Sequence, residues 1–577
     1  MSRPPLSSRF TNALCTTVAV LSLALSSNCT CAARESKADL VIFNAAIHTM
    51  DPAKPLASAL AVSGQKILKV GNDTEIKALA ASDTRMLDAH GKLVLPGFQD
   101  SHVHLAEGAA EAHGLNLNKA HTKDEALKMV ASFIKSHKED TQYVVNGLPL
   151  PAMDKEEITA DALDRLTEKP LVIYSEDAHT AWMNSATLAK LQKVSSQEDL
   201  DLLEKDSKGQ PTGVLRELLL TRLDEVIEPA PLEKRVQYLR EIVATANSFG
   251  ITAIQDAHAT EAILATYARL DRENALNLRV SAAQHTFKGM SENDFDKLVE
   301  RAKNYSGSNL KINTVKIFAD GVIETGTAAL LSPYLKDGKA SQSAGSLNFP
   351  PEELKQLVQE IVKRDFQIHI HAIGDRAVRE SLDALALVRE KSAKRDLRHV
   401  IAHLEMIDRQ DIPRFAELGV VADFQPYWSF RDPYVEKLTR PLLGDERTNA
   451  IYPIASVLKS GAHIAAGSDW TVSTLNPLDA ITVAVTRRRP GCPKDNPLNE
   501  NEAISTEEAV AAYTTGGAYL AGRESELGTL SAGKYADLIM LDKNIFQMPK
   551  SEIYKSKVVL TLIGGKTVFS KLAGWAK

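Results

Sequence analysis

The stretch Leu95-Pro96-Gly97-Phe98-Gln99-Asp100-Ser101-His102-Val103-His104 decides how the whole chain is interpreted. A Pro-Gly turn leads into an extended segment that ends in His-x-His. Because side chains alternate between the two faces of a strand, His102 and His104 point the same way. Two neutral imidazoles on one face can bind one metal ion. The pair alone is equally typical of two histidines on a half-exposed strand. Whether a metal binds here depends on further ligands elsewhere in the chain.

The composition is that of an ordinary globular protein. Of the 577 residues, 44% are hydrophobic and 25% are charged, and the length allows one large catalytic domain with additions. The formal net charge is -6 and no long basic run occurs, so nucleic acid is not expected as a partner. We expect a small-molecule substrate, and we leave a homodimer open.

Residues 1–33 differ from the rest of the chain. Arg3 and Arg9 precede an apolar run at about 13–25, and small residues follow. This order predicts a secretory signal peptide and therefore a periplasmic or secreted protein. The run is shorter than the roughly 20 residues of a spanning helix, so no stable membrane anchor is expected. The alternatives are an uncleaved anchor or a lipid on Cys29 or Cys31.

Cysteine contributes little to the expected fold. Three of the four cysteines lie in or beside the leader, and Cys492 is the fourth. No disulfide framework is therefore expected. A metal site must use histidine, carboxylate or modified lysine.

The two ends of the chain have a similar texture. Short apolar runs broken by glycine occur near the start, for example at 39–43, and again near the end, for example at 558–563. We expect residues 34–94 and 520–577 to form one small β-sandwich domain together.

Residues 95–519 alternate strands and helices, which predicts an α/β fold, a (β/α)₈ TIM barrel. The stretch of about 105–250 is too long for one crossover, so we expect an insertion after the first barrel strand. The strands expected in this middle part are 171–174, 252–255, 315–318, 367–371, 399–403, 420–423 and 463–467.

Polar side chains stand where several of these strands end, which is where active residues of such barrels lie. Each has an ordinary alternative, since a lysine can face solvent and an aspartate can cap a helix. The residues are His102, His104, Lys316, His371, His403 and Asp469.

Six motifs taken together resemble the amidohydrolase superfamily of metal-dependent barrel hydrolases. The match is best to its amidohydrolase family 3 branch, which includes N-substituted formamide deformylases. In chain order the motifs are 95–104, 316–321, 371–377, 401–403, 467–470 and 528–537. They extend over nearly all of the chain after residue 38.

This resemblance implies a centre of two divalent metal ions, for which zinc is the first choice at a histidine-rich site. His102, His104 and Asp469 would bind one ion. His371 and His403 would bind the other.

The resemblance also implies that Lys316, carboxylated by CO₂, bridges the two ions. The implied reaction is hydrolysis of a non-peptide carbon–nitrogen bond of amide, N-formyl or carbamate type by a metal-bridged hydroxide. Asp469 would be the catalytic group that takes the proton and passes it to the leaving nitrogen.

Four residues are candidates for substrate binding, each with a structural alternative. His179 stands in the segment Asp177-Ala-His179 of the expected insertion. Asp320 and Arg376 flank the implied ligands and could instead orient ligands or begin a helix. Gln425 opens the run Gln425-Pro-Tyr-Trp428, whose rings could wall a pocket.

Two other functions stay open at this stage. A deaminase of a small cyclic or amino compound would use the same barrel with one metal, but the one-metal deaminases lack a bridging lysine such as Lys316. A non-catalytic binding protein on this scaffold is the third alternative. The complete set of implied metal ligands argues against it, because a protein without catalysis would not need all of them.

Overall fold

The computed structural model describes residues 37–149, 158–176, 178–197, 200, 203–391 and 396–575. The expected leader with its three cysteines, and Asp177, lie outside the described residues. Cys492 is a free thiol. Within the described ranges, none of the helices is long and apolar enough to cross a lipid bilayer.

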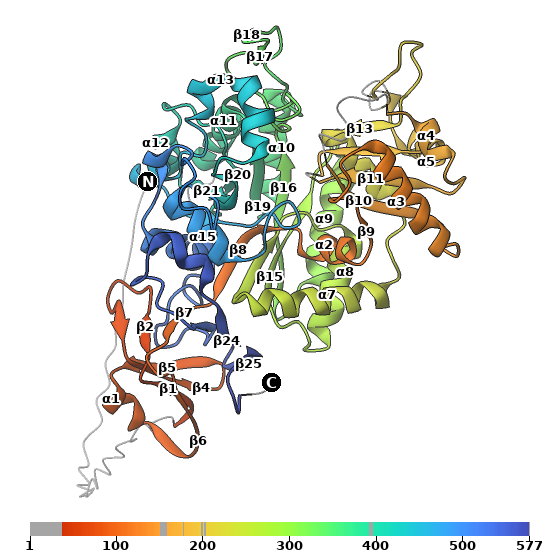
Figure 1. The fold of residues 1–577 in the computed structure, drawn as a ribbon. Helices are drawn as coiled ribbons and strands as arrows, with labels where there is room; N and C mark the ends of the chain where they lie inside the picture. The colour runs from red at the N-terminus through yellow and green to blue at the C-terminus, as the bar shows by residue number, and fades with distance from the viewer. Residues whose placement is uncertain are drawn as a thin grey trace, which may run out of the picture. The chain divides into compact units, whose positions relative to one another are not determined.

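The centre of the fold is a sheet of eight strands whose neighbours all pair in parallel (Figure 1). Strand order around the sheet follows the order along the chain, as in a (β/α)₈ barrel. The strands are β8 (Phe98–Val103), β14 (Ile251–Asp256), β15 (Arg279–His285), β16 (Leu310–Phe318), β19 (Gln367–Ala372), β20 (Val400–His403), β21 (Val421–Phe424) and β22 (Ile464–Ala466).

The first and last strands come together through the segment that follows β22. The backbone N–H of Asp469 donates to the carbonyl of His102 at 2.7 Å, and the N–H of His104 donates to the carbonyl of Trp470 at 3.0 Å. Gly467 allows this approach, because a Cβ atom there would lie 2.5 Å from the backbone nitrogen of His102. The backbone contacts that join the last strand to the first therefore also bring Asp469 next to His102 and His104.

Helices cover the outside of the barrel, so its strands are buried on both faces. In α10, Pro351 begins the helix, two glutamates stand in its first turn, and the buried residues recur at helical spacing. The helices that follow or flank barrel strands are α2 (Leu105–Ala112), α7 (Leu232–Ser248), α8 (Glu261–Arg272), α9 (Glu292–Tyr305), α10 (Pro351–Lys363), α11 (Asp375–Lys391), α12 (Ile412–Leu418), α13 (Arg440–Thr448), α14 (Ile454–Lys459), α15 (Pro477–Thr486), α16 (Thr506–Ala511) and α17 (Gly517–Leu520).

Short helical turns and one small hairpin complete the loops of the barrel. They are η3 (Pro426–Trp428), η4 (Val435–Thr439), η5 (Glu500–Glu502), η6 (Ala512–Gly516) and η7 (Lys550–Lys555), with the hairpin β17 (Leu335–Lys336) and β18 (Lys339–Ala340).

The insertion after the first barrel strand has its own sheet, in the order β13-β12-β11-β10-β9, and its own buried clusters (Figure 1). The strand expected at 171–174 forms here as β11 and not in the barrel. The elements are β9 (Leu115–Asn116), α3 (Lys123–Ser136), β10 (Tyr143–Leu148), α4 (Ala160–Asp164), β11 (Leu171–Ser175), β12 (Thr180–Met183), α5 (Ser185–Val194), β13 (Val214–Arg216) and η2 (Glu217–Glu225).

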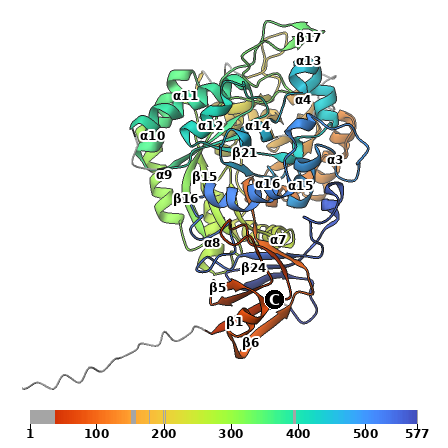
Figure 2. The ribbon, with the colours of Figure 1, turned by 90° about the vertical axis from the view of Figure 1, so that its left-hand side faces the viewer.

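Two further sheets are built from residues 38–96 and 538–570, which lie side by side in both views (Figures 1 and 2). One has the order β5-β4-β1-β6, and the other has the order β25-β24-β23-β7-β2-β3. Many of their buried residues, from both segments, share one hydrophobic cluster. The strands are β1 (Ala38–Phe43), β2 (Ala46–His48), β3 (Leu56–Ala57), β4 (Ala59–Ser63), β5 (Lys66–Gly71), β6 (Ala80–Asp88), β7 (Leu93–Pro96), β23 (Leu538–Leu541), β24 (Val558–Ile563) and β25 (Lys566–Ser570), with helix α1 (Asp73–Lys77).

The fold class is therefore as predicted, a (β/α)₈ barrel with an additional β domain. The strand β15 was absent from the prediction. Its sequence, Arg-Val-Ser-Ala-Ala-Gln-His, contains a single large aliphatic residue, so it lacks the apolar run that identifies a buried strand.

Candidate metal centre and substrate cavity

The implied metal ligands come from five places at the carboxyl ends of barrel strands. His102 lies in β8 and His104 just after it, Lys316 lies near the end of β16, and His371 lies in β19. The remaining two are His403, the last residue of β20, and Asp469, three residues after β22.

Five of these groups lie close to one another. The Nζ of Lys316 lies 3.1 Å from the Nε2 of His102, and the Oδ1 of Asp469 lies 3.7 Å from the same nitrogen. Oδ1 of Asp469 also lies 3.2 Å from Nε2 of His104, while its Oδ2 lies 4.0 Å from Nδ1 of His403. One ligand atom each of His102, His403 and Asp469 lies within 4.8 Å of the others, which is close enough for one ion.

The chemistry of these donors fits a metal. Oδ1 of Asp469 and Nδ1 of His403 are buried without a hydrogen-bond partner in the described structure. Buried polar atoms normally have partners, and such orphans point to a group that completes them. Burial also lowers the pKa of His102, His371 and His403, so these imidazoles are neutral at neutral pH, the form that binds metals.

His371 is placed differently from the other implied ligands. Its ring packs against that of His403, with centroids 4.5 Å apart. Its Nε2 faces the carbonyl of Gly321 at 3.3 Å and Oδ1 of Asp320 at 3.8 Å. The imidazole thus borders the cluster, near enough for the charge of Lys316 to help lower its pKa.

Lys316 is fully buried among these groups, and burial lowers its pKa from 10.5 to about 8. The lowered pKa increases the share of neutral amine at neutral pH. Neutral amine is the form of lysine that can add CO₂.

The opposite nitrogen of His102 belongs to a second network. Nδ1 of His102 lies 2.8 Å from Nε2 of His369, and Nδ1 of His369 lies 2.8 Å from Nε2 of Gln255. The amide oxygen of Gln255 has no hydrogen-bond partner among the described residues. If the Gln255 amide is turned over, His369 donates to that oxygen and accepts from His102, which leaves the Nε2 lone pair of His102 free for a metal.

Asp423, in β21, is the other member of this second network. Its Oδ2 lies 3.9 Å from both His102 and His369, and burial raises its pKa well above the usual range. His102, His369 and Asp423 could together hold an ion, but none of them lines the large cavity described below. The first cluster is therefore the one that a substrate can reach.

Two of the site residues have left-handed backbone conformations. φ is 75° at His403 and 50° at Asp469. Such conformations cost energy for residues other than glycine and concentrate at functional sites.

A cavity of about 360 Å³ opens onto the first cluster, within the size range of small-molecule sites. His371, His403 and Asp469 line it, as do side chains of the insertion and of the loop after β21. The insertion therefore forms part of the substrate cavity.

Of the four residues predicted to bind substrate, one lines the large cavity. His179 lines the cavity, with Nδ1 2.8 Å from Oε2 of Glu217 and its ring 5.3 Å from that of His371. Asp320, Arg376 and Gln425 are not among the lining residues.

Asp320 has a structural task in this arrangement. Its carboxylate accepts backbone N–H groups from Ala329, Ile373 and Gly374 at 2.9–3.0 Å, which fixes two loops beside His371. Arg376 lies in the first turn of α11, and Gln425 is buried at the end of β21. Tyr427 and Trp428, from the run that Gln425 opens, do line the cavity.

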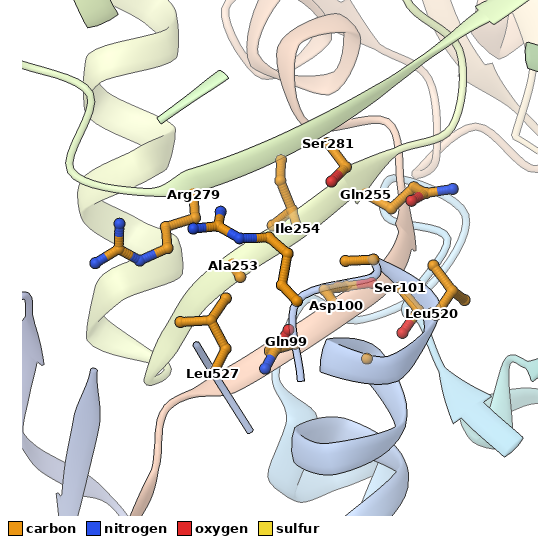
Figure 3. Close-up of a pocket in the computed structure, with 13 residues that line it drawn as sticks. Gln99, Asp100, Ser101, Ala253, Ile254, Gln255, Arg279, Ser281, Leu520 and Leu527 are labelled. Carbon is orange, nitrogen blue, oxygen red and sulfur yellow. The ribbon is translucent and has the colours of Figure 1, made fainter. Parts of the chain in front are cut away.

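A smaller cavity of about 20 Å³ lies inside the barrel, bordered by Asp100, Gln255 and Arg279 (Figure 3). That volume is on the order of one water molecule. It is too small for a substrate, so the large cavity is the candidate active site.

Several groups around the site could not be predicted from the sequence. Asp224, His258 and His285 form a further cluster, with the rings of the two histidines 4.5 Å apart. The same holds for Glu405 and Tyr452 in the cavity wall. They come from separate segments of the chain, and no spacing in the sequence links them.

Comparisons with known proteins agree with this geometry. The model of the amidohydrolase family, Amidohydro_3, matches residues 85–569. The chain is 28% identical over 553 residues to the protein LONG AFTER FAR-RED 3 of Arabidopsis thaliana, covering 92% of each. It is 27% identical over 546 residues to the N-substituted formamide deformylase of Arthrobacter pascens, covering 91% of this chain and 97% of that enzyme.

Among solved structures, an uncharacterized metal-dependent hydrolase from Pyrococcus horikoshii OT3 superposes with a TM-score of 0.70. It shares 24% sequence identity and covers 89% of this chain and 99% of its own, so it supports the fold.

The chain belongs to the amidohydrolase family. It is a metal-dependent hydrolase of the class that acts on carbon–nitrogen bonds other than peptide bonds.

Proposed function

We propose that this protein hydrolyses an acyl carbon–nitrogen bond, of amide, N-formyl or carbamate type, at a centre of two divalent metal ions. The observation that supports this most is the approach of Lys316 Nζ to within 3.1 Å of His102 Nε2, inside a ring of histidines and one aspartate. A carboxylated lysine is an anionic ligand with two oxygens, and it would turn this contact into a bridge between the two ions.

His102, His104 and Asp469 would hold one ion, and His371 and His403 would hold the other. Zinc is our first choice, because imidazole and carboxylate ligands suit it. When bound, the two ions supply hydroxide near neutral pH and polarise the acyl oxygen.

Asp469 has the position that the proton transfer requires. Among the residues that the structure describes, its Oδ1 is buried without a hydrogen-bond partner, and Asp469 lines the cavity. We assign it the role of accepting the proton of the attacking water and delivering it to the leaving nitrogen. His179, held by Glu217, contacts the substrate from the side of the insertion.

The experiment is a substrate panel with the zinc-loaded protein. We expect formamides or other N-acyl amines to give an acid and an amine in equal amounts. A deaminase would instead release ammonia from an amino or ring compound and leave the acyl substrates unchanged. No turnover of any acyl compound by fully metal-loaded protein would contradict the proposal.

Export from the cytoplasm stays part of the proposal, on the strength of residues 1–33 alone. Sequencing the N-terminus of the mature protein tests it, and a chain that still starts at Met1 would contradict it.

A further inference from the structure

The cavity wall beyond the proposed metal centre carries an unusual set of charges. Glu324, Glu405 and Asp432 line it, and no lysine or arginine is found among its described lining residues. Arg431, adjacent to Asp432, is occupied elsewhere: it donates to Glu436, Asn449 and the carbonyl of Pro497.

Glu405 is the central member of this acidic wall. It stands two residues after His403 and is only 4% exposed, yet its Oε2 has no hydrogen-bond partner in the described structure. Glu324 and Asp432 line the same cavity and, with Asp320, place negative charge around its carboxyl, while Tyr452 offers it a hydrogen bond. Burying a carboxylate without a cation is costly, so a ligand that brings a positive charge is favoured here.

The two neighbouring carboxylates are held in place. Thr439 donates its hydroxyl to Oε1 of Glu324 at 2.8 Å, and the backbone N–H of Val435 donates to Oδ1 of Asp432 at 2.7 Å. Because other elements fix these oxygens, the acidic wall is already formed in the protein without a ligand.

Aromatic side chains complete this part of the cavity. Tyr434 and Tyr452 line it, and the buried hydroxyl of Tyr434 has no hydrogen-bond partner within the described part of the chain. Trp428 lies parallel to the ring of His403, with centroids 5.5 Å apart, and so connects this wall to the metal centre. Aromatic faces beside carboxylates are suited to an ammonium or guanidinium group.

We propose that Glu405, with Glu324 and Asp432, forms a subsite for a positively charged group of the substrate. The preferred substrate is then an N-acyl compound that carries a protonated amino or guanidinium group away from the bond that is cut. This inference rests on the proposed function, because the same cavity contains the hydrolytic cluster.

The test compares three N-formyl substrates of similar length: mono-formylated pentanediamine, formylated hexylamine and formylated aminohexanoic acid. Their free ends are cationic, neutral and anionic. We expect kcat/KM to fall in that order. In Glu405→Gln, the cationic substrate should lose on the order of 10- to 100-fold in kcat/KM, the usual range for a hydrogen bond to a charged group, while the neutral substrate changes little.

Glu324→Gln is the second variant, and Glu417→Gln, at an exposed position on α12, is the matched control. An equal loss for the cationic and the neutral substrate would overturn the subsite. The same holds for a preference for the anionic substrate in the wild type.

A binding measurement separates this inference from the proposed reaction. Calorimetry with hexylamine and hexanol needs no turnover. We expect hexylamine to bind more tightly than hexanol and to lose about 10-fold or more in affinity in Glu405→Gln. Equal binding of both compounds to wild type and variant would overturn the subsite even if hydrolysis is observed. Selective binding without hydrolysis of any acyl compound would retain the subsite and refute the proposed reaction.

Discussion

The Nζ of Lys316 lies 3.1 Å from the Nε2 of His102, although 214 positions separate the two residues in the sequence. Each side chain lies near the carboxyl end of its barrel strand, and both are fully buried. A lysine ammonium is a poor neighbour for metal-binding histidines, because it repels a cation. A carboxylated lysine reverses that charge.

Replacing Lys316 with alanine should therefore remove the bridge. We expect kcat/KM to fall by at least about 100-fold. Residues that only hydrogen-bond to metal ligands usually cost about 10- to 100-fold when they are replaced. Short carboxylates such as formate or acetate should restore part of the activity by filling the space. Unchanged activity in Lys316→Ala would refute the bridging role.

Asp469→Asn should keep the fold and lose turnover. The amide cannot accept the proton that the carboxylate takes, and general acid–base catalysis contributes about 10²- to 10⁴-fold. Steady-state kinetics measure the loss, and the thermal midpoint measures the fold. Activity within a few-fold of wild type would contradict the role of Asp469.

The pair of His369 and Gln255 should control metal affinity without touching the substrate. We expect His369→Gln to weaken metal binding by about 10- to 100-fold, because His102 loses the partner that fixes its ring and tautomer. Competition with a chelator measures the affinity. His463→Gln is the matched control, at an exposed histidine stacked on Tyr519 at 3.7 Å. Equal metal affinity in both variants would argue against the network.

Burial of Lys316 should also make the stability of the metal-free protein depend on pH. Its pKa is lowered from 10.5 to about 8, so between these values the unfolded chain binds more protons than the folded one. The free energy of unfolding should therefore rise with pH across this window, by about 3 kcal/mol relative to Lys316→Met. Urea unfolding of both proteins in CO₂-free buffer tests this, and parallel pH profiles would contradict it.

The ion pair of Arg279 and Asp537 should matter for folding and not for chemistry. Two guanidinium nitrogens of Arg279 lie 2.5 and 3.0 Å from the oxygens of Asp537, joining barrel strand β15 to the C-terminal end of the chain. Removing one partner of such a buried pair costs about 3–5 kcal/mol. Arg279→Met should lower the urea midpoint while kcat stays close to wild type. A loss of kcat at unchanged stability would contradict this assignment.

Seven of the eight barrel strands could be predicted from the sequence, and polar residues recur at the ends of several of them. The predicted His-x-His strand is β8, although His104 lies just past its end, before α2. Periodicity cannot tell which sheet a strand joins, so the position of β11 in the insertion had to come from the structure. The cavity wall could not be predicted either. Glu324, Glu405 and Asp432 are far apart in the sequence and become neighbours only in the folded protein.

The metal content of the purified protein tests the central claim most directly. After loading with zinc and bicarbonate and removal of free metal, elemental analysis should find about two ions per wild-type chain and at most one per chain of Lys316→Ala. One ion or none in the wild type, or the same content in both proteins, would contradict a lysine-bridged pair of metals at this site.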